Sequence, residues 1–304
     1  MSTEIKNVMV LGGRGNLGPH LIRALVKASF TVSVLSRTSS NVTESAFLGA
    51  SIVKSDYTFS SLVDVFTGQD AVISTLSTAN IAEQKIVIDA VAAAKVKRFM
   101  PSEFGSDTSV EGLEKMAPFL KEKQDVMDHV KSKEADGLSW TAIFTGPWID
   151  WMLLEGKGLL CLDIKTKTGE LVNSGKLKFT TTTVSKVGEA TAAALLHSDR
   201  TKNEYVHVAS YNTCQKQVIE AVERLSRTKI QLEKLDNKDL YARATKHIDQ
   251  GNWGRGYYEL ATATVYSDAP VTYFPDKAAH WMKVLDLVQD ETFDEMINRV
   301  IQTV

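Results

Sequence analysis

The stretch that decides the fold reads VMVLGGRGNLG, from Val8 to Gly18. An apolar strand ends in it, and an amphipathic helix is expected directly after it, over residues 19–28. In this pattern Gly12 permits a tight turn, Gly15 lets the backbone approach a pyrophosphate, and Gly18 allows close helix packing. The N–H groups and dipole of the helix start would face the anion. The stretch predicts a dinucleotide-binding cradle formed by Gly12, Gly13, Arg14, Gly15, Asn16, Leu17 and Gly18.

A glycine-rich turn with a purely structural role is the alternative interpretation of this stretch. It is the weaker one here, because a strand precedes the glycines, a helix follows them, and the chain then enters a second β run at residues 30–35. That order is the βαβ unit in which such glycines bind a nucleotide.

Strands and helices alternate through the first half of the chain, which predicts a Rossmann-type α/β fold with a doubly wound parallel sheet over residues 1–147. Residues 148–304 are expected to form mainly a smaller C-terminal α+β substrate domain over the carboxyl ends of the strands. A helix at 186–197 and a strand at 205–209 predict that residues 184–210 return to the sheet. The earlier strands are expected at 7–11, 31–35, 51–54, 71–75, 98–100 and 141–145, and the earlier helices at 19–28, 60–66, 81–94 and 118–133.

The composition excludes several classes of partner. The net charge of −2 over 304 residues lacks the basic excess of a nucleic-acid binder. No apolar run reaches the 18 residues of a membrane span, and the polar first residues do not resemble a secretory leader, so a cytoplasmic monomer or homodimer is expected. Cys161 and Cys214 stand far apart without metal-ligand spacing, and no metal site is expected.

The end of the second expected strand bears on the choice of nucleotide. NAD-selecting chains place Asp or Glu there, whereas an Arg suits the 2′-phosphate of NADP. This chain has Arg37, whose guanidinium can pair with a phosphate, followed by the hydroxyls of Thr38 and Ser39. The residues predict NADPH or NADP⁺ as the cofactor, although Arg37 could instead be a solvated loop charge. Asp56 could contact the adenine or cap a turn.

The segment VKRFMPSEFG, residues 96–105, resembles the strand-five region of the isoflavone reductase-like, or NmrA-like, branch of the atypical short-chain dehydrogenases. Together with the cradle and Arg37, the resemblance covers about the first half of the chain. It implies an NADPH-binding Rossmann domain and a C-terminal substrate domain. Many members reduce aromatic or phenolic secondary metabolites, and others are redox sensors without turnover. The resemblance further implies cofactor contacts from Thr75, Ser77, Gln84, Pro101, Ser102 and Phe104, and substrate contacts from Glu103 and Phe104.

Reductases of this family use a lysine on the helix after strand five, which implies Lys123 as the catalytic residue and as a cofactor contact. The helical pattern agrees, because Lys123 falls on the apolar stripe of Phe119, Val126 and Val130, whereas Lys121 falls on the opposite face. A lysine on a core-facing stripe needs a partner or a function, since burying an unpaired ammonium is costly. A stem that carries its amine to solvent is the alternative.

Two features depart from related enzymes. The plant reductases carry basic residues just beyond the lysine, whereas this chain continues with Val-Met-Asp-His at 126–129. Ordinary short-chain dehydrogenases use a Tyr-xxx-Lys pair on one helical face. Tyr273 and Lys277 have that spacing, but Pro275 would break such a helix, so the match is interpreted as coincidence.

Aromatic side chains follow the sixth expected strand, at the sheet edge where a substrate should bind. Trp148, Trp151 and Met152 could form a flat apolar pocket for an aromatic ligand or a seam between domains. Tyr257 lies in a segment that could be a pocket flap or a packed loop.

The sequence therefore predicts an NADPH-dependent reductase that transfers hydride to a small aromatic or heterocyclic metabolite. A redox-sensing regulatory protein without turnover, and a non-redox enzyme such as a cyclase on the same fold, are the alternatives.

Overall fold

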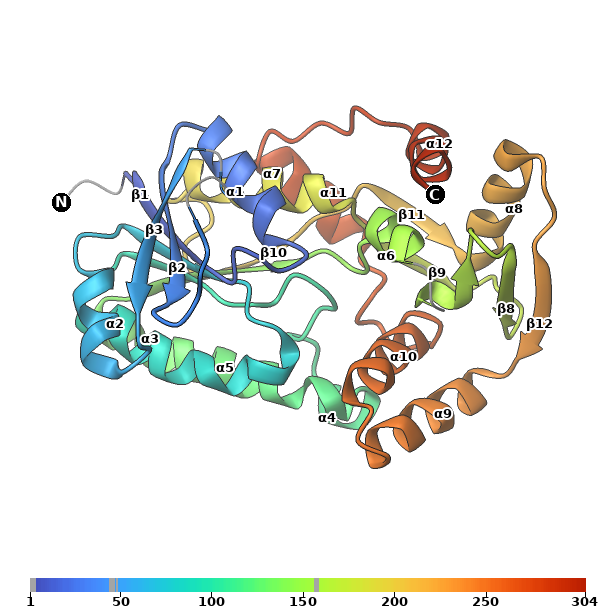
Figure 1. The fold of residues 1–304 in the computed structure, drawn as a ribbon, viewed down its shortest axis with the longest axis horizontal. Helices are drawn as coiled ribbons and strands as arrows, with labels where there is room; N and C mark the ends of the chain where they lie inside the picture. The colour runs from blue at the N-terminus through green and yellow to red at the C-terminus, as the bar shows by residue number, and fades with distance from the viewer. Residues whose placement is uncertain (1–3, 44–46, 48, 156–158) are drawn as a thin grey trace.

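Seven parallel strands form the central sheet of the computed structural model, which describes residues 4–43, 47, 49–155 and 159–304 (Figure 1). The strand order is β10-β6-β5-β4-β1-β2-β3, and β1 pairs with both β2 and β4. This is the doubly wound order with one further strand beside β6, and it confirms the predicted fold class. The strands are β1 (Asn7–Leu11), β2 (Thr31–Arg37), β3 (Ala50–Ser55), β4 (Ala71–Ser74), β5 (Arg98–Met100), β6 (Ser139–Phe144) and β10 (Glu204–His207).

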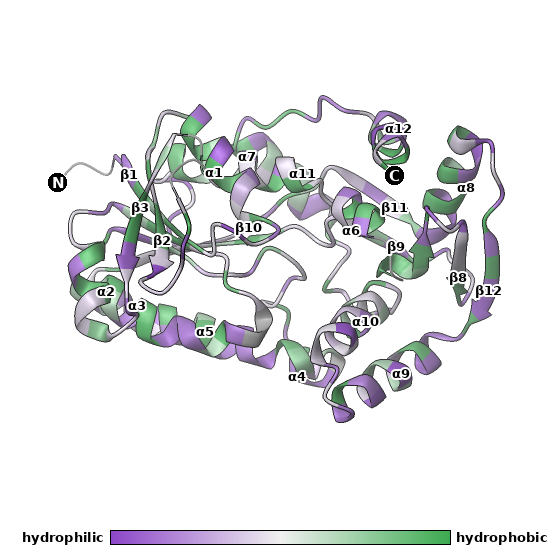
Figure 2. Ribbon diagram, in the orientation of Figure 1, coloured by the Kyte–Doolittle hydropathy of each residue, from purple (hydrophilic) through white to green (hydrophobic). Residues whose placement is uncertain are grey.

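Helices cover both faces of this sheet. One face packs against α1 (Gly18–Lys27) and α7 (Val184–Leu196), and the other packs against α2 (Phe59–Phe66), α3 (Gln84–Ala93) and α5 (Lys121–Ser132) (Figure 1). Because helices exclude water from both sides, the strands between them are almost continuously apolar. The helices themselves are amphipathic, and Figure 2 shows hydrophilic residues along much of α5.

Two expected helices begin differently from the prediction. The helix expected at 118–133 starts as the 3₁₀ turn η3 (Pro118–Leu120), and the one expected at 81–94 is preceded by the 3₁₀ segment η2 (Thr78–Glu83). A kink with non-helical backbone angles at Asn80 explains the second difference. Helix ends of this kind are poorly specified by hydrophobic periodicity.

A second lobe lies at the carboxyl ends of the sheet strands and has its own apolar core (Figure 1). Its strands form two small sheets, one antiparallel pair and one of three strands. They are β9 (Lys178–Thr181) with β11 (Tyr211–Cys214), and β7 (Leu162–Asp163), β8 (Thr168–Val172) and β12 (Gln231–Leu235). Its helices are α6 (Ile149–Glu155), η5 (Leu159–Cys161), α8 (Gln215–Ser226), α9 (Asn237–Asp249), α10 (Trp253–Val265) and α12 (Phe293–Thr303).

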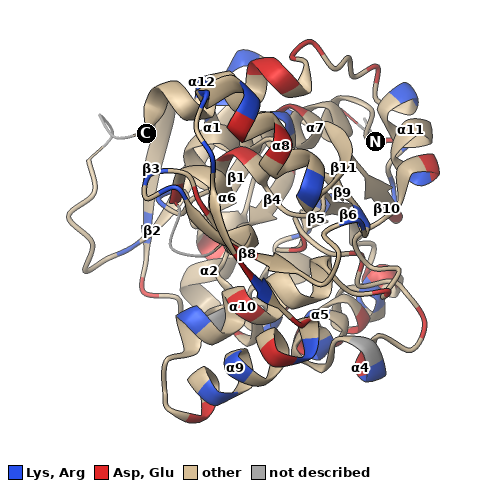
Figure 3. Cartoon of the chain, turned by 90° about the vertical axis from the view of Figure 1, so that its right-hand side faces the viewer, with Lys and Arg blue, Asp and Glu red and all other residues tan. Residues whose placement is uncertain are grey.

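The remaining short elements connect the two parts: α4 (Leu113–Met116) precedes η3, η4 (Glu134–Asp136) precedes β6, and α11 (Pro275–Val284) packs beside β10. In the view of Figure 3, basic and acidic residues are interspersed over the helices. Among the described helices, none combines the length and apolar character needed to cross a bilayer.

A buried arginine ties three segments of the sheet together. Arg98 in β5 donates hydrogen bonds to the hydroxyls of Ser139 and Thr141 in β6. It also donates to the Thr201 hydroxyl and to the Ser198 carbonyl, both between α7 and β10. Neutral acceptors therefore satisfy the guanidinium donors, as a buried cation requires.

Candidate active site

The glycine loop is held tightly between β4 and α1. Gly12 adopts a φ of +80°, and a side chain there would lie 2.5 Å from the Thr75 hydroxyl oxygen. The Thr75 hydroxyl donates to the Leu11 carbonyl oxygen at 2.7 Å, which fixes the loop to the end of β4. A side chain at Gly18 would lie 2.6 Å from the Gly13 α-carbon, so Gly18 accommodates the loop's own backbone. Only glycine fits these two positions without displacement.

The start of α1 has the features of an anion site. No described side chain caps this helix, whose first turn contains Pro19. Arg14, Gly15 and Asn16 are exposed in front of it. An uncapped helix start carries backbone N–H donors and the positive end of the helix dipole, and both favour a phosphate. The cradle residues thus fit a dinucleotide pyrophosphate.

Arg37 ends β2, and 61% of its side chain is exposed. Its guanidinium carbon lies 5.7 Å from the centre of the Tyr57 ring, and one terminal nitrogen lies 3.7 Å from the Glu83 carboxylate. Thr38 and Ser39 are exposed beside it. Lys54 in β3 donates from Nζ to the Ser40 carbonyl at 2.5 Å, which brings a second cation to this loop.

Lys54 is a residue that the sequence analysis missed. The signal is the register of two strands, in which Ser36 of β2 pairs with Lys54 of β3. Asp56, two residues further, accepts hydrogen bonds from the Thr58 N–H and hydroxyl. Thr58 in turn caps α2, so Asp56 has the structural role of a turn cap.

Gln84 and Ser102 brace the loops after β4 and β5 against each other. Gln84 is completely buried, and its amide oxygen accepts from the Ser102 N–H at 2.9 Å. The Ser102 hydroxyl donates to the Leu76 carbonyl at 2.8 Å. Ser77 is exposed beside them, and Pro101 is buried. These hydrogen bonds give Gln84 and Ser102 a bracing role at the mouth of the cradle.

Lys123 is buried in α5 and points to the loop after β5. Its Nζ donates to the Glu103 carbonyl oxygen at 2.6 Å and lies 3.8 Å from the Glu103 carboxylate. The Glu103 side chain is 1% exposed, and Thr108 donates to it at 3.0 Å. Next to this pair, Phe104 has a φ of +33°. Residues with strained backbone conformations of this kind cluster at functional sites. Lys121, on the opposite face, is exposed and paired with Asp125.

Burial shifts both groups of this pair toward neutrality. It raises the pKa of the Glu103 carboxyl to about 7, against the opposing charge of Lys123. Burial also lowers the pKa of the Lys123 ammonium, while the Glu103 carboxylate opposes that shift. Two groups with such pKa shifts at the carboxyl end of a parallel sheet are candidates for proton transfer near neutral pH.

Asp107 forms a second buried cluster four residues beyond Glu103. It accepts from His207 Nε2 at 2.7 Å and from Lys277 Nζ at 3.0 Å, and Ser109 donates to its other oxygen. Burial alone would raise the pKa of Asp107, but the hydrogen bonds from His207, Ser109 and Lys277 hold that pKa at about 2. The cluster anchors the loop after β5, which also carries Glu103, to the end of β10 and to α11.

The sequence analysis did not predict this cluster. The sequence analysis considered Lys277 only for its spacing from Tyr273. In the structure α11 begins at Pro275, between these two residues, so Tyr273 and Lys277 do not share a helix. No local pattern links Asp107, His207 and Lys277, because they come from three distant segments.

A chain of aromatic rings connects the start of α5 to the end of β6. Phe119 contacts Tyr257 edge-on at 5.5 Å between centroids, and Tyr257 lies 6.2 Å from Tyr258. Tyr258 lies 6.0 Å from Trp151, which lies 5.9 Å from Trp148. Trp148, Trp151 and Tyr257 are half-buried. The chain joins elements of both lobes beside the lysine helix.

Met152 has a different environment from its neighbours. It is 6% exposed and belongs to the apolar core of the second lobe. Trp151 packs against this core and also against the core of the sheet, so it occupies the seam as well as the aromatic chain.

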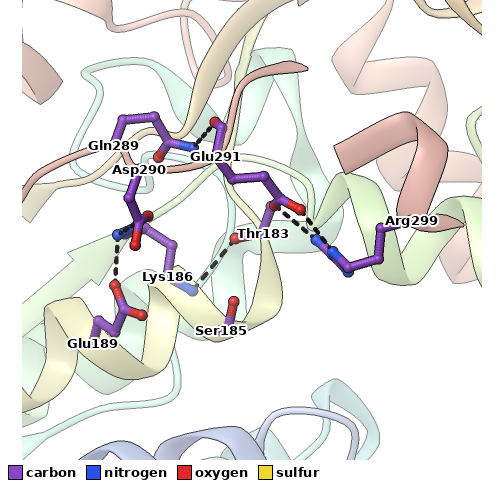
Figure 4. A pocket seen from close by; sticks show the side chains of 8 residues that line it. All are labelled: Thr183, Ser185, Lys186, Glu189, Gln289, Asp290, Glu291 and Arg299. Atoms are coloured by element: carbon purple, nitrogen blue, oxygen red, sulfur yellow. Dashed lines mark hydrogen bonds and ion pairs between the residues drawn. The ribbon is translucent and has the colours of Figure 1, made fainter. Parts of the chain in front are cut away.

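A cavity of about 280 Å³ lies elsewhere, between the start of α7 and the segment before α12 (Figure 4). Carboxylates neutralise its cations. The Lys186 ammonium contacts Glu189 and Asp290, and the Arg299 guanidinium pairs with Glu291. This ion-paired cavity does not fit a dinucleotide phosphate. Within the described part of the chain, no group of three or more His, Cys, Asp or Glu side chains could hold a metal ion.

Comparison with known proteins agrees with this geometry. Residues 4–251 match the model of the NmrA-like family. The chain belongs to the NmrA-like family. It is 33% identical over 246 residues to the oxidoreductase aprR of Aspergillus flavus, covering 80% of this chain and 82% of that protein. It is 29% identical over 292 residues to the oxidoreductase poxI of Penicillium oxalicum, covering 95% of this chain and 91% of the relative.

Solved structures share the fold of this NmrA-like protein. The structure of AtPrR2 with NADP⁺ and (+)-pinoresinol superposes with a TM-score of 0.78 at 23% identity, covering 98% of this chain and 99% of the other. The relatives aprR and poxI are both named oxidoreductases, which supports the same class of activity here.

Proposed function

We propose that this protein is an NADPH-dependent reductase that transfers hydride to a small aromatic or heterocyclic metabolite. The observation that carries the proposal is the buried pair of Lys123 and Glu103 at the carboxyl end of the sheet. Burying a lysine ammonium costs free energy even when a carbonyl and a carboxyl group contact it, so a buried lysine here favours a functional role. In a reductase it supplies the positive charge and the proton that the hydride acceptor needs.

The residues of the cradle suit the cofactor of such a reaction. The N–H groups at the start of α1 would hold the pyrophosphate, and Arg37 with Lys54 would hold the 2′-phosphate. When bound, the reduced nicotinamide supplies the hydride. The fold neighbour that was solved with NADP⁺ and (+)-pinoresinol is consistent with this choice.

The aromatic chain supports the proposed class of substrate. Trp148, Trp151 and Tyr257 offer flat apolar faces, and Tyr257 contacts Phe119 in the turn η3 that precedes the helix of Lys123. Such faces bind planar rings through offset or edge-on stacking. Glu103 and Phe104 are both buried, so in this proposal they shape the floor of the site through their backbone.

In the proposed reaction, Lys123 lies beside the acceptor atom of the substrate and donates a proton to it as negative charge develops. Hydrogen bonds from Lys123 to Glu103 fix the ammonium in this position, and the surrounding apolar residues strengthen its electrostatic effect. The hydrogen bond between Gln84 and Ser102 holds the loop of Glu103 in a fixed position relative to the cradle.

A spectrophotometric screen of NADPH oxidation against phenolic, enone and cyclic-imine compounds tests the proposal. We expect turnover of at least one class, with product formed in step with NADPH consumed. Tight NADPH binding without any turnover would contradict it and favour a redox sensor. Product formed without NADPH consumption would instead identify a non-redox enzyme.

A further inference from the structure

A polar cavity of about 270 Å³ lies between α5 and the loop after β5 that carries Glu103 and Thr108. Its lining includes Thr108, Ser109, Gln124, Asp128, Lys131 and Tyr205. The aromatic chain and the cradle contribute none of the described lining residues, so the cavity is separate from the proposed substrate and cofactor sites. Its size and polar walls suit several water molecules.

One residue of this cavity reaches the catalytic pair. Thr108 lines the cavity, and its hydroxyl donates to the Glu103 carboxylate at 3.0 Å. The same carboxylate oxygen lies 3.8 Å from Lys123 Nζ. All three residues are buried, with exposed fractions of 3% for Thr108, 3% for Glu103 and 8% for Lys123. Thr108, a residue that lines the cavity, is thus hydrogen-bonded to the Glu103 carboxylate, and the same carboxylate forms an ion pair with the Lys123 ammonium.

A reductase of the proposed type needs such a supply. Each turnover takes one hydride from the reduced nicotinamide and one proton from the protein, so Lys123 must be reloaded once per cycle. The substrate and cofactor would cover the open side of the amine during the reaction. The polar cavity reaches Glu103 through Thr108, and because its lining shares no residue with the aromatic chain or the cradle, it would remain open to water at that stage.

We infer that Thr108 and Glu103 form a proton relay that returns a proton to Lys123 from water in this polar cavity. The inference rests on the proposed function, because it supplies the proton of that reaction. Glu103 and Thr108 are positioning and relay residues in it, and Lys123 remains the group that meets the substrate.

The proton balance of the relay closes. The Lys123 ammonium gives one proton to the substrate anion formed by hydride addition and becomes a neutral amine. The Glu103 carboxylic acid then gives its proton to that amine and becomes a carboxylate. The Thr108 hydroxyl passes its proton to the carboxylate and accepts one from cavity water, which takes a proton from bulk solvent. The net change is one proton from solvent for each hydride transferred.

The direction of transfer agrees with the acid strengths of the groups. Burial raises the pKa of Glu103 to about 7, so the carboxyl is partly protonated near neutral pH. In an ordinary environment a lysine amine is a much stronger base than a carboxylate. Burial lowers the pKa of Lys123, and the charge of the Glu103 carboxylate opposes that shift. The residual carboxylate is stabilised by the Thr108 hydrogen bond.

The first experiment uses the cofactor-free protein and does not depend on turnover. Infrared difference titration of the wild type should show a carboxyl signal that titrates near pH 7 and that disappears in Glu103→Gln. In Thr108→Val this titration should move to higher pH, because the carboxylate loses a hydrogen bond, and in Thr108→Ser it should return. A Glu103 signal that is unaffected by Thr108→Val would overturn the relay.

The second experiment measures kinetics on a substrate from the screen. We expect Thr108→Val to lower kcat by about tenfold and to raise the solvent deuterium isotope effect, with NADPH affinity unchanged and with recovery in Thr108→Ser. Glu111→Gln changes another side chain of the same cavity lining but keeps the Thr108 contact to Glu103, so its isotope effect should match the wild type.

The outcomes separate the two proposals. Turnover in Thr108→Val at the wild-type rate and with the wild-type isotope effect would overturn the relay and leave the reductase intact. Absence of turnover in the wild type would overturn the proposed function, while the infrared result still decides whether Thr108 controls the protonation of Glu103.

Discussion

The ring of Trp151 in α6 lies 6.0 Å from the ring of Tyr258 in α10, measured between centroids. Through this contact the segment that leaves the sheet after β6 meets the helix that carries Tyr257. Both helices belong to the second lobe, and Trp151 also packs against the core of the sheet, so this aromatic wall lies where the two parts of the molecule meet.

Replacing Trp151 by Ala tests that wall. If Trp151 stacks on the substrate, Trp151→Ala should raise KM by about tenfold, equivalent to about 1.4 kcal/mol, and leave the Kd for NADPH nearly unchanged. Steady-state kinetics and cofactor titration measure the two effects, and Trp151→Phe is the matched control. Strong destabilisation with unchanged KM in the folded fraction would identify a structural seam instead.

Lys123→Ala tests the catalytic assignment. We expect kcat to fall by about 10²-fold or more, because the developing anion loses its proton donor, while NADPH still binds. Lys121→Ala removes the same charge from the exposed face and should change kcat little. Full turnover in Lys123→Ala would show that another group provides the proton.

Arg37→Asp tests the choice of cofactor. The substitution places a carboxylate where the 2′-phosphate would bind, so we expect NADPH binding to weaken by about 1–3 kcal/mol. NADH, which has no phosphate there, should bind no more weakly than to the wild type. Calorimetric Kd values for both cofactors provide the measurement, and equal wild-type affinities for the two would refute the assignment.

Gly18→Ala tests the packing of the cradle. The added carbon would lie 2.6 Å from the Gly13 α-carbon, so we expect a loss of stability of about 1–3 kcal/mol and weaker NADPH binding. Gly254→Ala is the matched control, because a carbon there meets no atom within 4 Å. At that helical position alanine should stabilise the protein by up to about 1 kcal/mol. Urea unfolding of both variants compares the effects.

Asp107→Asn tests the buried cluster through pH. The pKa of Asp107 is depressed from 3.8 to about 2, so its stabilisation is present above about pH 4 and is lost as the pH falls toward 2. We expect the variant to be about 2 kcal/mol less stable at pH 7, and the gap to the wild type to narrow below pH 4. Urea midpoints across this range measure it, and the exposed Asp64→Asn serves as control. A gap that is constant with pH would contradict the ionised cluster.

The local parts of this architecture were accessible from the sequence. The glycine loop, the alternation of strands and helices in the first half and the position of Lys123 on an apolar stripe each follow from spacing within a few turns of chain, where periodicity is informative. The same holds for the family, because the segment at 96–105 is contiguous. The starts of α5 at Lys121 and of α3 at Gln84 were less accessible, since a 3₁₀ turn and an α-helix share much of their residue pattern.

The parts that sequence analysis missed depend on contacts between distant segments. Lys54 reaches the loop after Arg37 through strand register, and His207 reaches Asp107 across 100 residues. The role of Thr108 depends on a cavity that forms only when α5 packs beside the loop. None of these relations has a signature in one stretch of chain, because tertiary packing alone creates them.

The position of β10 has a consequence for synthesis. The ribosome releases β6 long before β10, because much of the second lobe lies between them in the sequence. Until β10 emerges, the edge of β6 has no partner strand. Arg98 also lacks its acceptors at Ser198 and Thr201 during this time. An open edge strand invites pairing with other chains. A nascent chain halted between residues 147 and 198 should therefore be the form most dependent on chaperones, and the sheet should close cooperatively once β10 emerges.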